Sequence, residues 1–218
     1  MSTTFTVGVV GAGRVGAVLS AALRVGGHHV VAAAGESDAS RQRIDALLPG
    51  VPTRKPSDVA RACDLLLLTV PDDMLSNVVT VLADAGALRE GQVVVHTSGR
   101  HGLAVLAPAA EVGARTIALH PAMTFTGTEV DLPRLAGCVF GVTAPAAERE
   151  LAEQLVADLG GQLMWVTEER RRELIKKAKG AGENARHPQC AHQGCDRPFG
   201  PSQVTARHRS PAPSPDRR

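Results

Sequence analysis

The sequence contains a glycine-rich run, Gly11-Ala12-Gly13-Arg14-Val15-Gly16, whose spacing suits the binding of a diphosphate group. The first glycine permits a tight turn, the second lets a diphosphate approach the backbone, and the third lets a helix pack closely on a sheet. The run follows the apolar residues 5–10 and opens a segment with apolar residues at helical spacing. The free N–H groups of that helix would then face the phosphates. We expect a dinucleotide-binding turn; the alternative is a similar fold that binds no nucleotide.

The residues after the next expected strand, 29–34, bear on which dinucleotide is bound. NAD-binding proteins usually carry Asp or Glu at the end of this strand, where the carboxylate holds the ribose 2′-hydroxyl. Here the strand ends in Ala33-Ala34-Gly35, Glu36 lies just beyond it, and Ser37 and Arg41 follow. A guanidinium binds a phosphate through paired, charge-assisted hydrogen bonds. We therefore expect NADP, with Ser37 and Arg41 as ligands of the 2′-phosphate.

The same residues also have an explanation without a ligand. Ser37 or Asp38 could cap the following helix, and the arginines could lie on its solvated face. The two interpretations are compatible, since one turn can supply both a cap and a phosphate ligand.

Three loops follow later strands, and ligands of open α/β sheets bind at the carboxyl ends of strands. The first contains Val70 and Pro71, which we expect beside the cofactor ribose. The second is His96-Thr97-Ser98-Gly99 and the third is His120-Pro121-Ala122-Met123. We expect both beside the nicotinamide.

Hydride transfer needs positioning and one proton donor or acceptor. His120, His96 and Ser98 are the candidate catalytic residues, although a histidine at a strand end is often only a hydrogen-bonded structural residue. No lysine lies between Lys55 and Lys176, which excludes a lysine acid or base within that stretch.

Strand-like and helix-like segments alternate as far as Trp165, which predicts a doubly wound, parallel α/β sheet of about seven or eight strands. Hydrophobic residues make up 44% of the chain and aromatic residues only 2%, so the core must be aliphatic, as in strands buried on both faces. The expected strands are residues 5–10, 29–34, 51–54, 64–70, 92–96, 115–119, 137–142 and 162–166.

Composition changes near Lys176, so we expect a dinucleotide-binding domain over 1–175 and the end of a helix with a disordered basic tail over 176–218. Residues 1–175 carry 15 Lys and Arg against 19 Asp and Glu, whereas residues 176–218 carry 9 against 3. A basic tail can bind nucleic acid, but a Pro-rich segment with few apolar residues is more typical of solvated disorder.

The four cysteines predict no disulfide framework and no metal site. We expect Cys63 and Cys138 to be inert buried thiols, and Cys190 and Cys195 to lie in the polar tail, where their spacing leaves zinc binding as the less favoured alternative. Without a stretch of about 20 apolar residues or a signal peptide, we expect a cytoplasmic protein that makes no membrane contact.

Several motifs together resemble a known family. They are Val9-Val10-Gly11-Ala12-Gly13-Arg14-Val15-Gly16, Thr69-Val70-Pro71-Asp72, His96-Thr97-Ser98-Gly99 and His120-Pro121-Ala122-Met123-Thr124-Phe125. The chain resembles, from about residue 5 to 175, Rossmann-like proteins with a C-terminal domain of unknown function, similar to β-hydroxyacid dehydrogenases and ketopantoate reductases. The resemblance implies an NADP-dependent oxidoreductase acting on a small 2-keto acid, with ketopantoate as one candidate substrate.

The chain departs from that family after Leu174-Ile175, where relatives continue into a helical domain that forms the dimer and completes the substrate site. We expect the helical domain to be truncated or replaced, and with it the family's homodimer and its activity to be lost. Three hypotheses compete: an NADP-dependent reductase, a non-catalytic nucleotide-binding or sensor module, and a truncated inactive product.

Overall fold

The computed structural model describes residues 3–171. The predictions made for the tail over 176–218, including Cys190 and Cys195, lie outside the described residues. Within the described part of the chain, no helix is both long and apolar enough to cross a bilayer.

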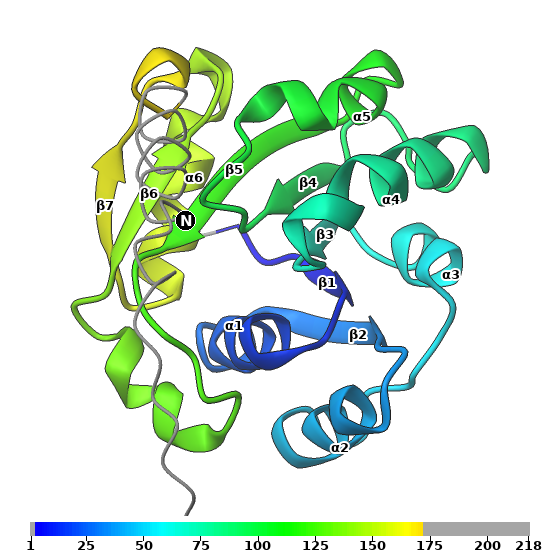
Figure 1. Cartoon of the computed structure of the whole chain (residues 1–218), viewed down its shortest axis with the longest axis vertical. Coiled ribbons are helices and arrows are strands. Elements are labelled where there is room, and N and C mark those ends of the chain that lie inside the picture. The colour runs from blue at the N-terminus through cyan, green and yellow to red at the C-terminus, as the bar shows by residue number, and fades with distance from the viewer. Residues whose placement is uncertain (1–2, 172–218) are drawn as a thin grey trace, which may run out of the picture.

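The described residues form a seven-stranded sheet in the order β2-β1-β3-β4-β5-β6-β7 (Figure 1). The first five strands are parallel and alternate with helices along the chain, which confirms the doubly wound α/β fold. The strands are β1 Thr6–Val10, β2 His29–Ala34, β3 Leu65–Leu68, β4 Val93–His96, β5 Arg115–Pro121, β6 Val139–Thr143 and β7 Gln162–Trp165.

The sheet departs from parallel pairing at β6, which runs antiparallel to β5, whereas β7 is parallel to β6. The sequence predicts parallel strands throughout. A parallel pair needs a crossover, usually through a helix, but the chain between β5 and β6 forms only two short 3-10 turns, Glu129–Asp131 and Pro133–Leu135. The chain therefore re-enters the sheet at the edge where β5 ends. The strand expected over 51–54 is reduced to one bridge between Thr53 and Ala33.

Two layers of helices cover the sheet. Hydrophobic side chains of α1, α2 and α6 join one core cluster, and those of α3, α4 and α5 join the other. Both clusters are mainly Val, Leu, Ile and Ala, as the composition predicts. After β4 the chain forms a 3-10 turn, Leu103–Leu106, which leads into α5, and Pro108, which lacks an N–H, lies in the first turn of α5. The helices are α1 Arg14–Val25, α2 Asp38–Leu47, α3 Pro56–Arg61, α4 Asp72–Asp84, α5 Ala107–Glu111 and α6 Arg149–Asp158.

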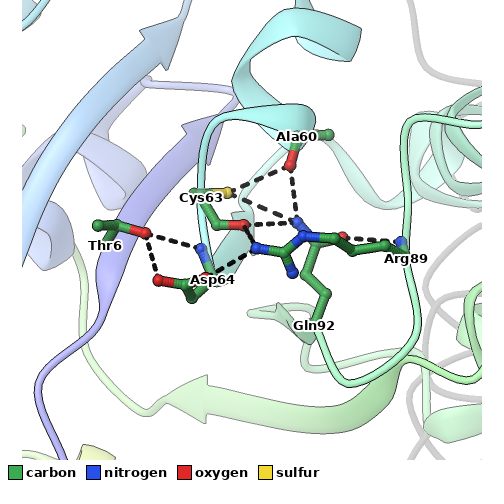
Figure 2. A network of polar contacts seen from close by, with 6 residues as sticks. All are labelled: Thr6, Ala60, Cys63, Asp64, Arg89 and Gln92. Carbon is green, nitrogen blue, oxygen red and sulfur yellow. Dashed lines mark hydrogen bonds and ion pairs between the residues drawn. The ribbon is translucent and has the colours of Figure 1, made fainter.

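A polar network joins the starts of β1, β3 and β4, at the end of the sheet where these parallel strands begin (Figure 2). The Thr6 hydroxyl donates to Asp64 over 2.7 Å, and Arg89 donates to the other oxygen of the same carboxylate over 2.7 Å. The Gln92 side chain donates to the carbonyls of Ala60 and Cys63. The network fixes the amino ends of three strands and leaves their carboxyl ends to form the site.

The two cysteines of the described residues are both buried free thiols, which confirms the burial predicted for Cys63 and Cys138. Burial raises the pKa of the Cys63 thiol to about 11. Because the thiolate is the reactive form, this cysteine is a structural residue at neutral pH.

Candidate functional site

A cleft of about 1210 Å³ lies where the parallel strands end. This volume exceeds the 300–1,000 Å³ or so that is usual for small-molecule sites. Its walls come from the glycine turn, the end of β2 and the residues before α3, and from the loops that follow β3 and β4 and the end of β5. The sequence prediction that these separate loops share one site is therefore consistent with the geometry.

The glycine turn has the shape that its sequence predicts. Gly11 has a φ of +90°, a backbone conformation that favours glycine, and a Cβ there would lie 2.7 Å from the Val70 nitrogen. At Gly16 a Cβ would lie 2.2 Å from the Thr69 hydroxyl oxygen, so this glycine is required for α1 to pack against the sheet. At Gly13 the nearest atom to a Cβ would be 3.8 Å away, which leaves open space beside the backbone.

The N-terminus of α1 is free to bind an anion. Its N-cap is Gly13, no side chain among residues 3–171 caps it, and no acidic residue lies in its first turn. The first N–H groups of a helix have no partners within the helix, and the helix dipole adds positive potential there. The open space at Gly13 lies at this N-terminus, so the described residues fit a bound diphosphate.

At the end of β2, the capping interpretation of Ser37 is confirmed. Its hydroxyl oxygen accepts from the Ser40 N–H over 3.1 Å and caps α2, and Ser37 also lies in the cleft wall. Arg41 is engaged elsewhere: its guanidinium donates to the Glu36 carbonyl over 2.7 Å and to the Asp38 carboxylate over 2.5 Å. To bind a phosphate, Arg41 would have to exchange these partners.

Two basic residues that the sequence analysis missed, Arg54 and Lys55, lie in the cleft wall. They follow Thr53, whose bridge to Ala33 places them beside the end of β2. Arg14, within the glycine turn, lines the same part of the cleft. Their position in the sequence could have identified them. They stand at the carboxyl end of the strand expected over 51–54, and the carboxyl ends of neighbouring parallel strands meet at one edge of the sheet.

His96 is fully buried and does not line the cleft. The Ser98 N–H donates to its Nδ1 over 3.1 Å, and its Nε2 lies 3.1 Å from the Gly102 carbonyl oxygen. Because a carbonyl oxygen only accepts, Nε2 carries the proton and both ring nitrogens are used. Burial lowers the pKa of His96 to about 4, so the ring is neutral at pH 7. This geometry describes a histidine that shapes the loop after β4.

Ser98 shapes the same loop. Its hydroxyl oxygen accepts from the N–H groups of Arg100, over 3.1 Å, and His101, over 3.0 Å. Ser98 is only 7% exposed, although it contributes to the cleft wall together with Thr97 and Gly99. The ring Nε2 of His101 lies 3.0 Å from the Asp72 carbonyl oxygen, which joins this loop to the start of α4.

His120 is the histidine that lines the cleft. Its Nδ1 lies 3.0 Å from the Thr97 carbonyl oxygen, so Nδ1 donates and Nε2 is left as an acceptor in the neutral ring. Gly99 lies against this ring, since a Cβ at Gly99 would be 2.7 Å from Nε2. The structure therefore brings His120, Thr97–Gly99, Val70, Pro71 and the glycine turn together, and leaves His96 and Arg41 outside the cleft wall.

A family model described as a Rossmann-like domain matches residues 1–121, more than half of the chain. The chain belongs to this Rossmann-like family. No curated protein matches it in sequence. Solved structures match the Rossmann-like fold at low identity.

Prephenate dehydrogenase from Aquifex aeolicus, in complex with hydroxyphenyl propionate and NAD+, has a TM-score of 0.66 at 17% identity, over 84% of this chain and 70% of its own. The 3-hydroxyisobutyrate dehydrogenase of Mycobacterium tuberculosis, in a structure with L-serine, has a TM-score of 0.64 at 19% identity, over 84% of this chain and 60% of its own. An imine reductase variant from Myxococcus stipitatus, in complex with NAD+, has a TM-score of 0.60 at 19% identity, over 83% and 61%. The chain thus spans between 60% and 70% of the length of these three proteins.

Proposed function

We propose that this Rossmann-like domain binds NADP and belongs to a reductase that acts on a small 2-keto acid or imine. The observation that carries the proposal is the uncapped N-terminus of α1, with open space at Gly13, in a cleft that continues to His120. The diphosphate would bind residues 11–16, and the ribose next to the nicotinamide would lie beside Val70 and Pro71. The solved dehydrogenases and reductases of the same fold support this assignment, two of them in complex with NAD+.

The preference for NADP rests on the basic side chains near the end of β2. Arg14, Arg54 and Lys55 line the cleft there, with the hydroxyls of Ser37 and Ser40, and Glu36 is the acidic residue among them. Arginine and lysine side chains both bind phosphate groups, arginine in a bidentate manner. Arg41, which the sequence favours, would join them only after releasing Asp38 and the Glu36 carbonyl.

His120 is the proposed proton donor. The nicotinamide cofactor would supply a hydride to the carbonyl or imine carbon. The Nδ1–H group of His120 stays hydrogen-bonded to the Thr97 carbonyl. A protonated His120 would give its Nε2 proton to the substrate oxygen or nitrogen and return to the neutral ring. The carbon–oxygen or carbon–nitrogen double bond thereby becomes a single bond, and the same histidine recovers a proton from solvent before the next turnover.

The test combines nucleotide binding with turnover. Calorimetry with NADPH, NADH and 2′,5′-ADP measures which part of the cofactor is recognised, and NADPH oxidation is then followed with ketopantoate, other 2-keto acids and cyclic imines. Where NADPH oxidation is observed, His120→Ala is expected to lower its rate about 10²–10⁴-fold, the usual contribution of general acid catalysis. His29→Ala is the matched control, because His29 is exposed at the amino end of β2.

The outcomes separate the competing functions. Failure of both dinucleotides to bind would refute the nucleotide site. Binding without oxidation of NADPH with any substrate would refute turnover by this chain and leave nucleotide binding in place, since the glycine turn is complete without His120. Turnover that survives His120→Ala would mean that another group supplies the proton.

A further inference from the structure

Arg171 is a buried arginine for which the proposed chemistry has no direct use. The residue is 3% exposed and follows β7, in a helical turn in which the Thr167 carbonyl accepts from the Arg171 N–H. Its guanidinium donates to the Ser98 carbonyl over 3.2 Å, to the Gly141 carbonyl over 3.1 Å and to the Thr143 hydroxyl oxygen over 3.2 Å. The side chain therefore joins the loop after β4 to strand β6.

Burying a guanidinium costs free energy unless hydrogen bonds compensate for the lost water. Within residues 3–171, the three acceptors above are neutral oxygens, and the Glu168 carboxylate is the nearby charge that favours the cation. The planar guanidinium presents five donors in a fixed arrangement, which suits three acceptors that come from different segments. An apolar residue of similar size would fill the space but could not donate hydrogen bonds to these oxygens.

One of the oxygens that Arg171 binds, the Ser98 carbonyl, belongs to the loop that contacts the His120 ring. Ser98, whose carbonyl accepts from Arg171, lies between Thr97, whose carbonyl accepts from His120, and Gly99, which packs against the His120 ring. Glu168 adds a second contact from the same segment, since its carboxylate accepts from the Leu103 N–H over 2.6 Å. The loop over 97–103 is thus bound to the segment after β7 at both of its ends.

We propose that Arg171 is a positioning residue for His120. By fixing the Ser98 carbonyl, it holds the Thr97 carbonyl and Gly99 in place, and these hold the His120 ring at the cleft wall. The proposal rests on the proposed role of His120 as proton donor. It assigns to the segment that follows β7 a part in the site, although this segment lies beyond the residues that line the cleft.

The experiment compares Arg171→Met, Arg171→Lys and Arg149→Met in the full chain. Arg149 is an exposed arginine of α6 whose guanidinium lies 4.3 Å from the centre of the Trp165 ring, so it matches the change in side chain away from the cleft. The first readout is the NMR resonance of the His120 Cε1 proton, with its titration. The second is the affinity for NADPH beside that for 2′,5′-ADP, which lacks the nicotinamide.

With Arg171→Met, we expect a displaced His120 resonance with a shifted titration midpoint. We also expect NADPH binding to weaken about threefold to tenfold, a coupling typical of indirect contacts, while 2′,5′-ADP binding stays the same. Arg171→Lys should restore part of both effects, because an ammonium can still donate to the Ser98 carbonyl. Arg149→Met should change neither.

An unchanged His120 resonance and titration in folded Arg171→Met would overturn the proposal, as would an equal change in Arg149→Met. Should the methionine variant not fold, Arg171→Lys decides alone: a His120 titration identical to that of the unsubstituted chain refutes the positioning role. Failure of the unsubstituted chain to bind NADPH would instead refute the proposed cofactor, and the His120 resonance would still test the coupling to Arg171.

Discussion

The two ends of the cleft are built in different ways. The glycine-turn end is formed mainly by β1, the start of α1 and the end of β2, all within residues 6–37, and residues 53–55, Thr69 and Val70 lie against it. The His120 end is assembled from the loop after β4, the end of β5 and the segment after β7, and its hydrogen bonds join residues 23 and 73 positions apart. One end therefore depends on local folding, whereas the other depends on the finished sheet.

The difference suggests how binding and chemistry can be separated. Damage to the long-range contacts should disturb the His120 end and leave the phosphate site intact. Damage to the glycine turn should remove nucleotide binding altogether.

The largest effect is expected at the glycine turn, where Gly13→Ala and Gly16→Ala should act differently. At Gly16 the added Cβ would collide with Thr69 and with the Gly11 carbonyl, so unfolding stability should fall by about 1–3 kcal/mol, the usual cost of overpacking. At Gly13 the Cβ meets no atom within 3.8 Å, so the protein should keep its stability and lose NADPH binding. Urea denaturation and calorimetry measure the two effects. Normal NADPH binding by Gly13→Ala would place the diphosphate elsewhere.

The same contrast explains what the sequence predicts well. Residues 6–34 form a strand, a glycine turn, a helix and a strand whose signals are local, so the element types and the roles of Gly11 and Gly16 follow from spacing alone. The antiparallel entry of β6 has no such signal, because pairing direction depends on where the chain re-enters the sheet. His96 is the last residue of β4 and His120 the last but one of β5, so their positions in the sequence are alike. Only the tertiary fold buries one and places the other in the cleft.

Buried His96, which shapes the loop next to His120, should make the free energy of unfolding depend on pH. Its pKa is about 4 in the folded chain and near 6.5 when exposed, so the unfolded chain binds more protons between these values. The stabilisation is complete above pH 6.5 and is lost as the pH falls toward 4, by about 3 kcal/mol in all. Urea denaturation between pH 4.5 and 7.5 measures most of this loss.

His96→Gln is the control for this pH dependence. Glutamine can still donate to the Gly102 carbonyl but does not titrate, so the variant should show a shallower dependence over the same range, whatever its stability at pH 7. The two curves running parallel would show that other groups cause the loss.

The smallest effect is expected at the site proposed for the 2′-phosphate, the group that distinguishes NADPH from NADH. Arg54 lines the cleft and is exposed. Arg54→Ala should therefore weaken NADPH binding by about 1.5 kcal/mol, the lower end of the range for hydrogen bonds to a charged group, and should barely change NADH binding. Arg41→Ala removes a guanidinium already bonded to Asp38 and Glu36, so its effect should stay within about 0.5 kcal/mol, as for most surface substitutions. Calorimetry of both variants with both nucleotides measures the difference.

A larger loss of NADPH binding with Arg41→Ala would show that Arg41 exchanges its partners for the phosphate, as the sequence alone predicts. Equal losses for NADPH and NADH in Arg54→Ala would mean that this residue attracts the diphosphate and does not distinguish the two cofactors.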